Sequence, residues 1–82
     1  MAEYQIGLAY SNQAEYDQAI QAYRRALELN PNFEEAHIGL TGTLYRKGDK
    51  AGALAHIEEL EKTGKSATAQ ALKEWIKKQE TR

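Results

Sequence analysis

The feature that most constrains this chain is a pair of helical patterns in its first 32 residues, spaced for close helix packing. The first pattern is Ile6-Gly7-x2-Tyr10, and the second is Ala19-x3-Tyr23-x2-Ala26. The second ends at Asn30-Pro31, because proline cannot continue the backbone hydrogen bonds of a helix. Small residues let two helices approach and bulky residues fill the grooves between them. The pattern therefore predicts a helical hairpin over residues 2–32.

A weaker copy of this pattern lies 34 residues further along the chain. One alanine is identical between the copies, and the other matched positions keep their chemical class. An internal repeat of this length indicates stacked hairpins that share a continuous core. The matched pairs are Ile6 and Leu40, Tyr10 and Leu44, Ala19 and Ala53, Ile20 and Leu54, and Tyr23 and Ile57.

The combination of these residues with a period of 34 resembles the tetratricopeptide repeat, a helix-turn-helix unit. The resemblance implies an all-α fold, a right-handed α-α superhelix formed as a solenoid. It implies one domain over residues 1–82, with repeats at 2–32 and 33–65 and a C-terminal capping helix at 66–80. In the family, the first helices of successive repeats line a concave groove that receives an extended peptide or a helix.

Helix boundaries are predicted from capping and breaking residues. Asn32 is the expected N-cap of the third helix, with Glu35 reciprocating three residues on, and Ser66 is the expected cap of the last helix. Gly48 and Gly64 are placed to end helices in a left-handed conformation. The predicted helices cover about 2–12, 17–29, the Asn32 cap to 47, 50–62 and 67–80.

The last predicted helix carries an apolar stripe of Leu72, Trp75 and Ile76, which we expect to cover the open side of the second repeat. Its register has two alternatives. The spacing of the caps Asn32 and Ser66 keeps the period of 34, whereas Leu72 and Ile76 match the third helix better at a shift of 32.

Composition excludes several classes of function. With 11 basic and 12 acidic residues, the net charge of −1 argues against nucleic-acid binding. The charge is uneven, since residues 1–40 hold six acids and two bases and residues 41–82 hold six acids and nine bases. The lack of cysteine excludes disulfides and thiolate chemistry, and a cytoplasmic protein is expected. No apolar run is long enough to predict a membrane segment.

At 100° per residue, the first and third helices each carry two apolar stripes. One stripe, Ile6 with Tyr10 and Leu40 with Leu44, is expected to face the partner helix. The opposite stripe is what the resemblance offers as a partner-binding groove. An alternative is that its apolar members only pack against neighbouring helices. The predicted groove residues are Tyr4, Leu8, Ser11, Ile38, Gly42 and Tyr45, with Asn12, Glu35 and Arg46 supplying polar contacts.

The resemblance also limits the ligand. Some members of the family hold a terminal carboxylate with lysine, asparagine and arginine side chains on the concave face. The positions to compare here are Tyr4, Leu8, Ile38 and Gly39, which offer no cation. The groove is therefore expected to accept apolar side chains, not an acidic C-terminus of that type.

Neither catalysis nor a bound cofactor is predicted. His37, His56 and Glu59 compose a metal site on paper, but no cysteine or closely spaced ligand motif supports it. No glycine-rich phosphate loop or nucleophile motif occurs. The expected function is a non-enzymatic protein-protein interaction module that binds a partner peptide or helix, without a metal, a nucleic acid or a membrane.

Three departures from the family pattern give an alternative function. Glu3 replaces a bulky residue, Thr41 and Lys65 stand where glycine and proline are expected, and Ala14 stands where the second copy has Gly48. Alanine resists a positive φ angle, so the run from 11 to 16 is expected to straighten more easily than a glycine turn. The alternative is a self-associating scaffold, a homodimer formed end to end or by swapping the first helix.

Overall fold

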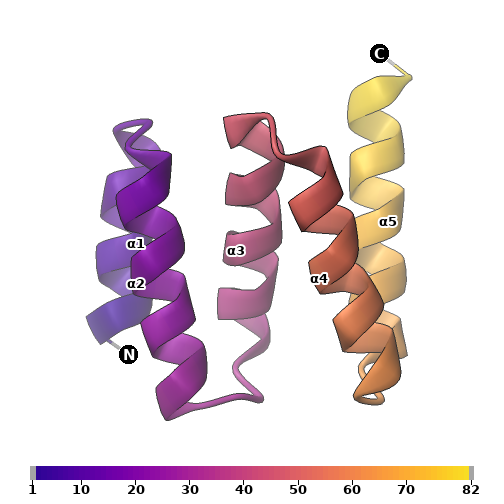
Figure 1. Ribbon diagram of the computed structural model, residues 1–82, viewed down its shortest axis with the longest axis horizontal. Helices are drawn as coiled ribbons and strands as arrows, with labels where there is room; N and C mark the ends of the chain where they lie inside the picture. The colour runs from indigo at the N-terminus through magenta and orange to yellow at the C-terminus, as the bar shows by residue number, and fades with distance from the viewer. Residues whose placement is uncertain (1, 82) are drawn as a thin grey trace.

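A computed structural model describes residues 2–81, and helices are the only regular secondary structure among them. The helices lie side by side, with α1 behind α2 in Figure 1, α3 in the middle, and α4 and α5 beyond it. This arrangement is the all-α superhelix that the sequence predicts. The helices are α1 (Ala2–Asn12), α2 (Tyr16–Leu29), α3 (Glu34–Lys47), α4 (Lys50–Lys62) and α5 (Ser66–Glu80).

The centre of the core is Tyr23 of α2, whose side chain is 1% exposed. Its ring lies so close to Gly7 of α1 that a Cβ atom there would be 2.7 Å from Cε1. A Cβ atom on Gly39 of α3 would also be 2.7 Å from the ring, at Cζ. Both distances are shorter than real Cβ contacts, so the two glycines admit one aromatic ring between three helices.

The close approach of α1 to Tyr23 corrects one expectation about α1. Ile6 was expected to face α2, but it is 48% exposed, and the buried residue of α1 is Gly7. Because the backbone at Gly7 is the point of contact, Ile6 lies about 100° round the helix from it. Leu40 and Leu44 of α3 are buried, as predicted.

The turns after α1 and α3 have the same backbone geometry. After α1, the Glu15 N–H donates to the Tyr10 carbonyl (2.9 Å) and the Ala14 N–H to the Ser11 carbonyl (3.0 Å). After α3, Asp49 and Gly48 donate to Leu44 and Tyr45 in the same pattern, a helix ending that needs a left-handed residue. Gly48 has φ 100° and Ala14 has φ 61°, so the run from 11 to 16 is bent here, not straight.

Two predicted N-caps are wrong. The residue before α3 is Phe33, not Asn32, and no side chain caps this helix, so the reciprocal contact with Glu35 is absent. The reason is local: the Asn30 side chain accepts a hydrogen bond from the Asn32 N–H (3.3 Å) and holds Asn32 in the turn. The residue before α5 is Lys65, and Ser66 is already helical.

The start of α5 is set by the end of α4. The Lys65 N–H donates to the Leu60 carbonyl at 2.8 Å, and Gly64 has φ 84°, as predicted. Lys65 therefore closes α4 and begins α5 at once. The side-chain cap that the sequence did not predict is Asp49, which accepts a hydrogen bond from the Gly52 N–H (2.9 Å) at the start of α4.

The register of α5 follows the shift of 32. Leu72 and Ile76 are 4% exposed each, and they correspond at this shift to the buried Leu40 and Leu44. At a shift of 34, Leu40 would correspond instead to the exposed Glu74. The cause is length, since the start of α2 at 16 lies 18 residues before α3, whereas the start of α4 at 50 lies 16 before α5.

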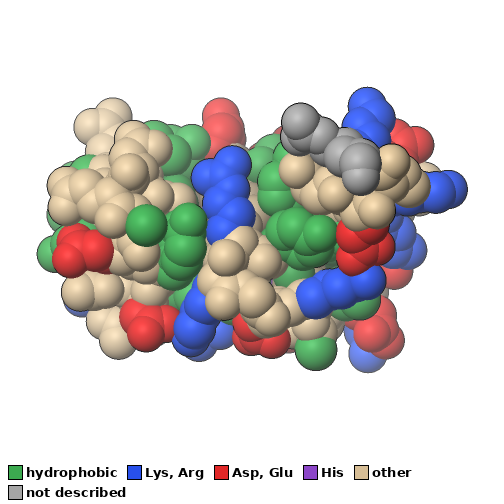
Figure 2. Space-filling model, turned by 90° about the horizontal axis from the view of Figure 1, so that it is seen from above, with side chains coloured by type: hydrophobic (Ala, Val, Ile, Leu, Met, Phe, Trp, Pro, Cys, Tyr) green, Lys and Arg blue, Asp and Glu red, His purple; other side chains and the backbone are tan. Residues whose placement is uncertain are grey.

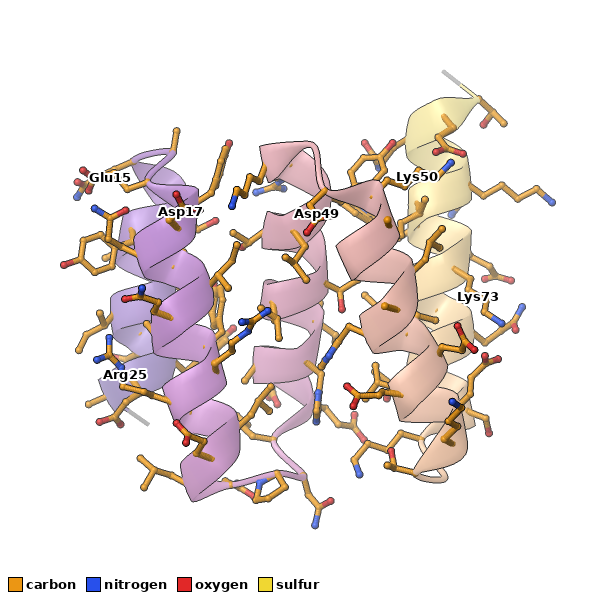
Figure 3. The ribbon with its side chains drawn as sticks, viewed as in Figure 1. Glu15, Asp17, Arg25, Asp49, Lys50 and Lys73 are labelled. Carbon is orange, nitrogen blue, oxygen red and sulfur yellow. The ribbon has the colours of Figure 1, made fainter. Side chains whose placement is uncertain are left out.

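Ion pairs join neighbouring helices at the surface (Figure 3). Lys47 at the end of α3 contacts Asp17 of α2 (2.6 Å), and Lys73 of α5 contacts Glu61 of α4 (2.6 Å). Lys50 at the start of α4 contacts Glu80 of α5. Exposed pairs of this kind stabilise a fold only slightly. We therefore assign the arrangement of the helices to the buried contacts.

The left-handed Ala14 makes a direct prediction about stability. Because glycine adopts positive φ without steric cost, we expect Ala14→Gly to raise the free energy of unfolding by about 1 kcal/mol. The matched control is Gly48→Ala, where no atom lies within 4 Å of the added Cβ, so only the φ angle is penalised. It should lower the free energy of unfolding by about 1 kcal/mol. Urea denaturation of both variants measures the two changes, and a loss of stability in Ala14→Gly would contradict the turn geometry.

Candidate functional site

A cavity of about 320 Å³ opens between α1, α3 and α5, and Tyr23 of α2 lies at its base. We call it the groove. Helices α1 and α3 each contribute an exposed aliphatic side chain, with Leu8 38% and Ile38 47% exposed. Between them lies Gly42, whose missing side chain keeps the floor low. The groove is lined by Leu8, Ser11, Asn12, Tyr23, Ile38, Gly39, Gly42, Thr43, Arg46, Ala71, Leu72 and Trp75.

The structure brings six of the nine predicted groove residues to this cavity, and three lie outside it. Those that line it are Leu8, Ser11, Asn12, Ile38, Gly42 and Arg46. Glu35 is exposed in the first turn of α3 and does not line the cavity. Tyr4 packs against Tyr23 (ring centroids 5.9 Å apart) and Phe33 (5.0 Å), so for Tyr4 the alternative of packing against adjacent helices describes its position.

Tyr45 corrects a further expectation. The sequence analysis places it on an exposed face, but it is half-buried and packs on the core. Its ring meets Trp75 of α5 edge to face, with centroids 5.4 Å apart and planes at 75°. The third helix of the groove therefore occupies the face of Tyr45 that a ligand would otherwise reach.

The sequence analysis missed the third wall of the groove. Helix α5 was assigned to covering the second repeat, whereas Ala71, Leu72 and Trp75 line the cavity. A Cβ atom on Gly42 would lie 4.0 Å from Trp75 Cη2, an ordinary contact distance across the floor. The register at 32 was the available signal, because it gives α5 the same position in the stack as α1 and α3.

Polar groups are confined to one end of the groove. Asn12 ends α1 and Arg46 lies in the last turn of α3, so both lie where the α1–α2 and α3–α4 turns come together. Seen from above, this end shows basic side chains between apolar ones (Figure 2). Ser11 Oγ and Thr43 Oγ1, 3.4 Å apart, bridge α1 and α3 deeper in the groove.

The Tyr23 phenol at the base is shielded from water. Burial raises the pKa of Tyr23 above its ordinary value, and the neighbouring Tyr4 raises it further. The positive charge of Arg46 and a hydrogen bond from Thr43 act in the opposite direction. The phenol is therefore neutral at physiological pH, and Arg46 is the groove's charged group.

His37 and His56 do come together, with His37 Nδ1 and His56 Nε2 3.0 Å apart. Within residues 2–81, however, no group of three or more His, Cys, Asp or Glu is arranged to hold a metal ion. The same residues include no helix long and apolar enough to cross a membrane.

Comparison with known proteins identifies related sequences. The family described as "Tetratricopeptide repeat" matches residues 1–33. The photosystem I assembly protein Ycf3 of Acaryochloris marina is 34% identical over 59 residues, which are 72% of this chain and 36% of that protein. The probable biofilm formation methyltransferase WspC of Pseudomonas putida is 34% identical over 64 residues, 78% of this chain and 15% of that protein. No solved structure matches the chain.

The chain belongs to the tetratricopeptide repeat family. Such repeats generally act as protein-protein interaction modules. The chain spans well under half the length of both relatives, so the likeness extends to a segment of each. In the structure, the matched repeat is followed by a helical pair, α3 and α4, and by α5.

Within this tetratricopeptide array, the two aromatic and aliphatic groove-side residues of α3 should differ in their effect on stability. We expect Tyr45→Ala to lower the free energy of unfolding by about 1–3 kcal/mol, because it removes a half-buried ring and its contact with Trp75. Ile38→Ala, at a largely exposed position, should change it by less than about 0.5 kcal/mol. Thermal and urea unfolding of the two variants provide the comparison. Equal effects would show that Ile38 belongs to the core.

Proposed function

We propose that the chain is a non-enzymatic binding module whose groove between α1, α3 and α5 receives a segment of a partner protein. The observation that carries the proposal is the pair of exposed aliphatic side chains, Leu8 and Ile38, on either side of the glycine floor at Gly42. A neighbouring large side chain would fill such a gap in an ordinary core. Exposed apolar surface with concave shape is typical of binding sites.

The groove favours a ligand with apolar side chains and an acidic group. Leu8, Ile38 and Trp75 supply apolar walls, and burying them is the main source of affinity. Arg46 at the polar end has no carboxylate partner among the ion pairs of residues 2–81, so its charge is available to a ligand. A short partner segment with two apolar residues followed by an aspartate or glutamate fits this arrangement.

The related proteins bear on this proposal in one respect. One is named as an assembly protein, which agrees with a module that holds other proteins together. The other is named as a methyltransferase, but this chain covers only 15% of it. We infer that catalysis in such a protein belongs to a part outside the matched segment, and that the repeat supplies binding.

The test begins with selection of peptides from a displayed random library against the intact chain. Binding of the selected peptide is then measured by calorimetry. We expect Ile38→Glu to weaken binding at least about tenfold, because a charge would replace apolar contact at the groove wall. Arg46→Gln should weaken it less, and the loss should shrink as salt is added, since the interaction is electrostatic.

The matched control is Leu54→Glu. Leu54 of α4 is 42% exposed, close to the 47% of Ile38, but it does not line the groove. The control should leave both the melting temperature and the peptide affinity unchanged. If Leu54→Glu weakens the peptide as much as Ile38→Glu does, the groove is not the site.

A second candidate function, self-association, is favoured by two observations. Ile6 is 48% exposed on α1, and Ala14 holds the following turn in a strained left-handed conformation. Straightening of that turn would release the strain and let α1 pack on a second copy of the chain.

Light scattering coupled to size exclusion tests self-association over a concentration series. If the dimer is swapped, Ala14→Gly should shift it to monomer, because glycine removes the strain. If the dimer forms through the exposed face of α1, Ile6→Gln should dissociate it and Ala14→Gly should have no effect. A parent chain that is monomeric at every concentration excludes self-association as the function.

A further inference from the structure

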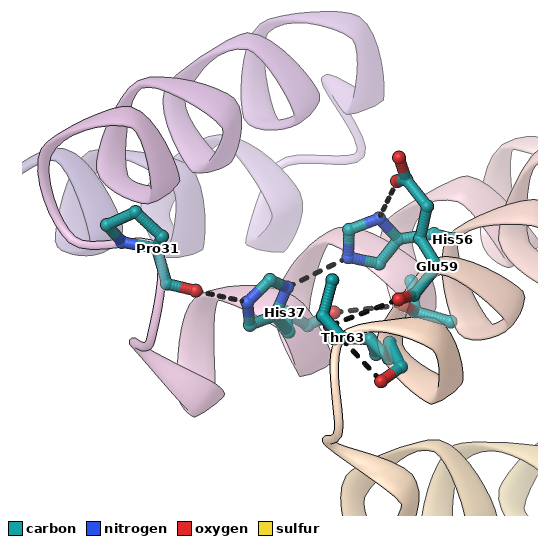
Figure 4. A network of polar contacts seen from close by, with 7 residues as sticks. Pro31, His37, His56, Glu59 and Thr63 are labelled. Atoms are coloured by element: carbon teal, nitrogen blue, oxygen red, sulfur yellow. Dashed lines mark hydrogen bonds and ion pairs between the residues drawn. The ribbon is translucent and has the colours of Figure 1, made fainter.

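A chain of hydrogen bonds joins the α2–α3 connection to α4 on the side of α3 away from the groove (Figure 4). The Pro31 carbonyl oxygen lies 2.7 Å from His37 Nε2, and His37 Nδ1 lies 3.0 Å from His56 Nε2. At the far end, His56 Nδ1 lies 3.8 Å from a Glu59 carboxylate oxygen. The two rings stack with centroids 5.1 Å apart.

The chemistry of these atoms fixes where the protons are. A carbonyl oxygen only accepts, so His37 must carry its proton on Nε2. Neutral His37 then presents a lone pair at Nδ1, and His56 must donate to it through Nε2–H. Neutral His56 is left with a lone pair at Nδ1, which faces the Glu59 carboxylate. Both rings are thus in the Nε2–H tautomer, and the lone pair of His56 at Nδ1 is the open position for a proton.

The first added proton fits this arrangement. On His56 Nδ1 it faces Glu59, and every existing hydrogen bond is retained. If it lies instead on His37 Nδ1, His56 changes tautomer, and the same contacts are satisfied with donor and acceptor exchanged. The second proton has no such place, because it sets two N–H groups and two positive charges against each other across 3.0 Å.

We propose that His37 and His56 form a proton-sensitive clasp between the α2–α3 connection and α4. The clasp is closed with no proton or one proton added, and it opens with the second. Because the connection joins the first helical hairpin to the second, opening frees the joint between the two hairpins while the groove residues stay in place.

The surroundings of the clasp support proton sensitivity in the weakly acidic range. His37 is 8% exposed, and the His56 side chain 14%. Burial lowers the pKa of His56 from its ordinary value of 6.5, and the neighbouring His37 and then Arg24 of α2 lower it further, whereas Glu59 raises it.

Other charges near the clasp are few. Glu28 of α2 and Asp49 line the open groove between α2 and α4 that His56 also borders. On α5, Lys73 pairs with Glu61. The balance at His56 is therefore set by burial and by its neighbours on α2, α3 and α4.

The sign of the pH dependence follows from this direction. Below pH 6.5, the unfolded chain binds a proton at His56 more readily than the folded chain does. The stability at this position is therefore complete above pH 6.5, and it declines as the pH falls from there toward the folded-state pKa. Opening by the second proton adds to the loss.

The experiment compares the intact chain with His56→Gln and Glu59→Gln by thermal unfolding between about pH 7.5 and pH 5. The glutamine at 56 keeps an N–H donor toward His37 but binds no proton, so we expect its melting temperature to fall by roughly 4–8 °C less than that of the parent. Glu59→Gln removes the carboxylate that favours the first proton, so its decline should exceed the parent's. The proposal is overturned if the parent and His56→Gln decline equally.

A second measurement needs no variant. Nitrogen-15 spectra of the imidazole rings at neutral pH should show both histidines as Nε2–H tautomers, and a Nδ1–H signal from His37 would overturn the proposal. On acidification, amide exchange at Ala36 and His37, at the start of α3, should accelerate at least about tenfold relative to Ala69 at the start of α5. Equal acceleration at both helix starts would mean general unfolding and would reject the clasp.

Discussion

The structure depends on one contact, the insertion of the Tyr23 ring between two glycines. Gly7 and Gly39 lie on different helices, and each would bring a Cβ atom within 2.7 Å of the ring. The ring thereby sets the separation of α1 and α3 from α2 at once. It also forms the base of the groove, so the residue that fixes the helix packing is the one that a ligand would meet deepest in the cavity. A smaller residue at 23 would leave a void shared by three helices, the situation in which large-to-small substitutions are most costly.

The second hairpin reaches the same geometry with different residues. The position equivalent to Gly7 is Thr41, and the position equivalent to Tyr23 is Ile57. Both are fully buried, at 0% and 1% exposure. A threonine fits where a glycine stood because the facing side chain is smaller, and its hydroxyl is satisfied by donating to the His37 carbonyl (2.9 Å). The departure of Thr41 from the family pattern is thus compensated across the helix contact, and the volume is conserved, not the residue type.

Sequence patterns predicted the helices because periodicity, proline and glycine act locally. The bounds of α1 and α4 and the left-handed glycines at 48 and 64 follow from residues next to them in the chain. The patterns were less successful where a residue's role depends on a distant contact. Ile6 and Tyr4 were assigned by helical phase alone, which does not reveal that the backbone of Gly7 lies against Tyr23. The caps at Asn32 and Ser66 failed because Asn30 and Lys65 compete for the same backbone groups.

The groove shows the same limit, since its third wall comes from α5 and required a change of register by two residues to be recognised. Helix α3 then carries two neighbouring residues with separate environments: Ile38 is exposed at the groove, and His37 is buried against His56 of α4. Because successive residues of a helix point about 100° apart, one helix can present a binding surface to one side and a titrating contact to the other. Packing around Tyr23 fixes the middle of α3, whereas its first turn has no side-chain cap and is held through His37 and the Pro31 carbonyl. The start of α3 is therefore the part of the array that its polar contacts, and not its core, control.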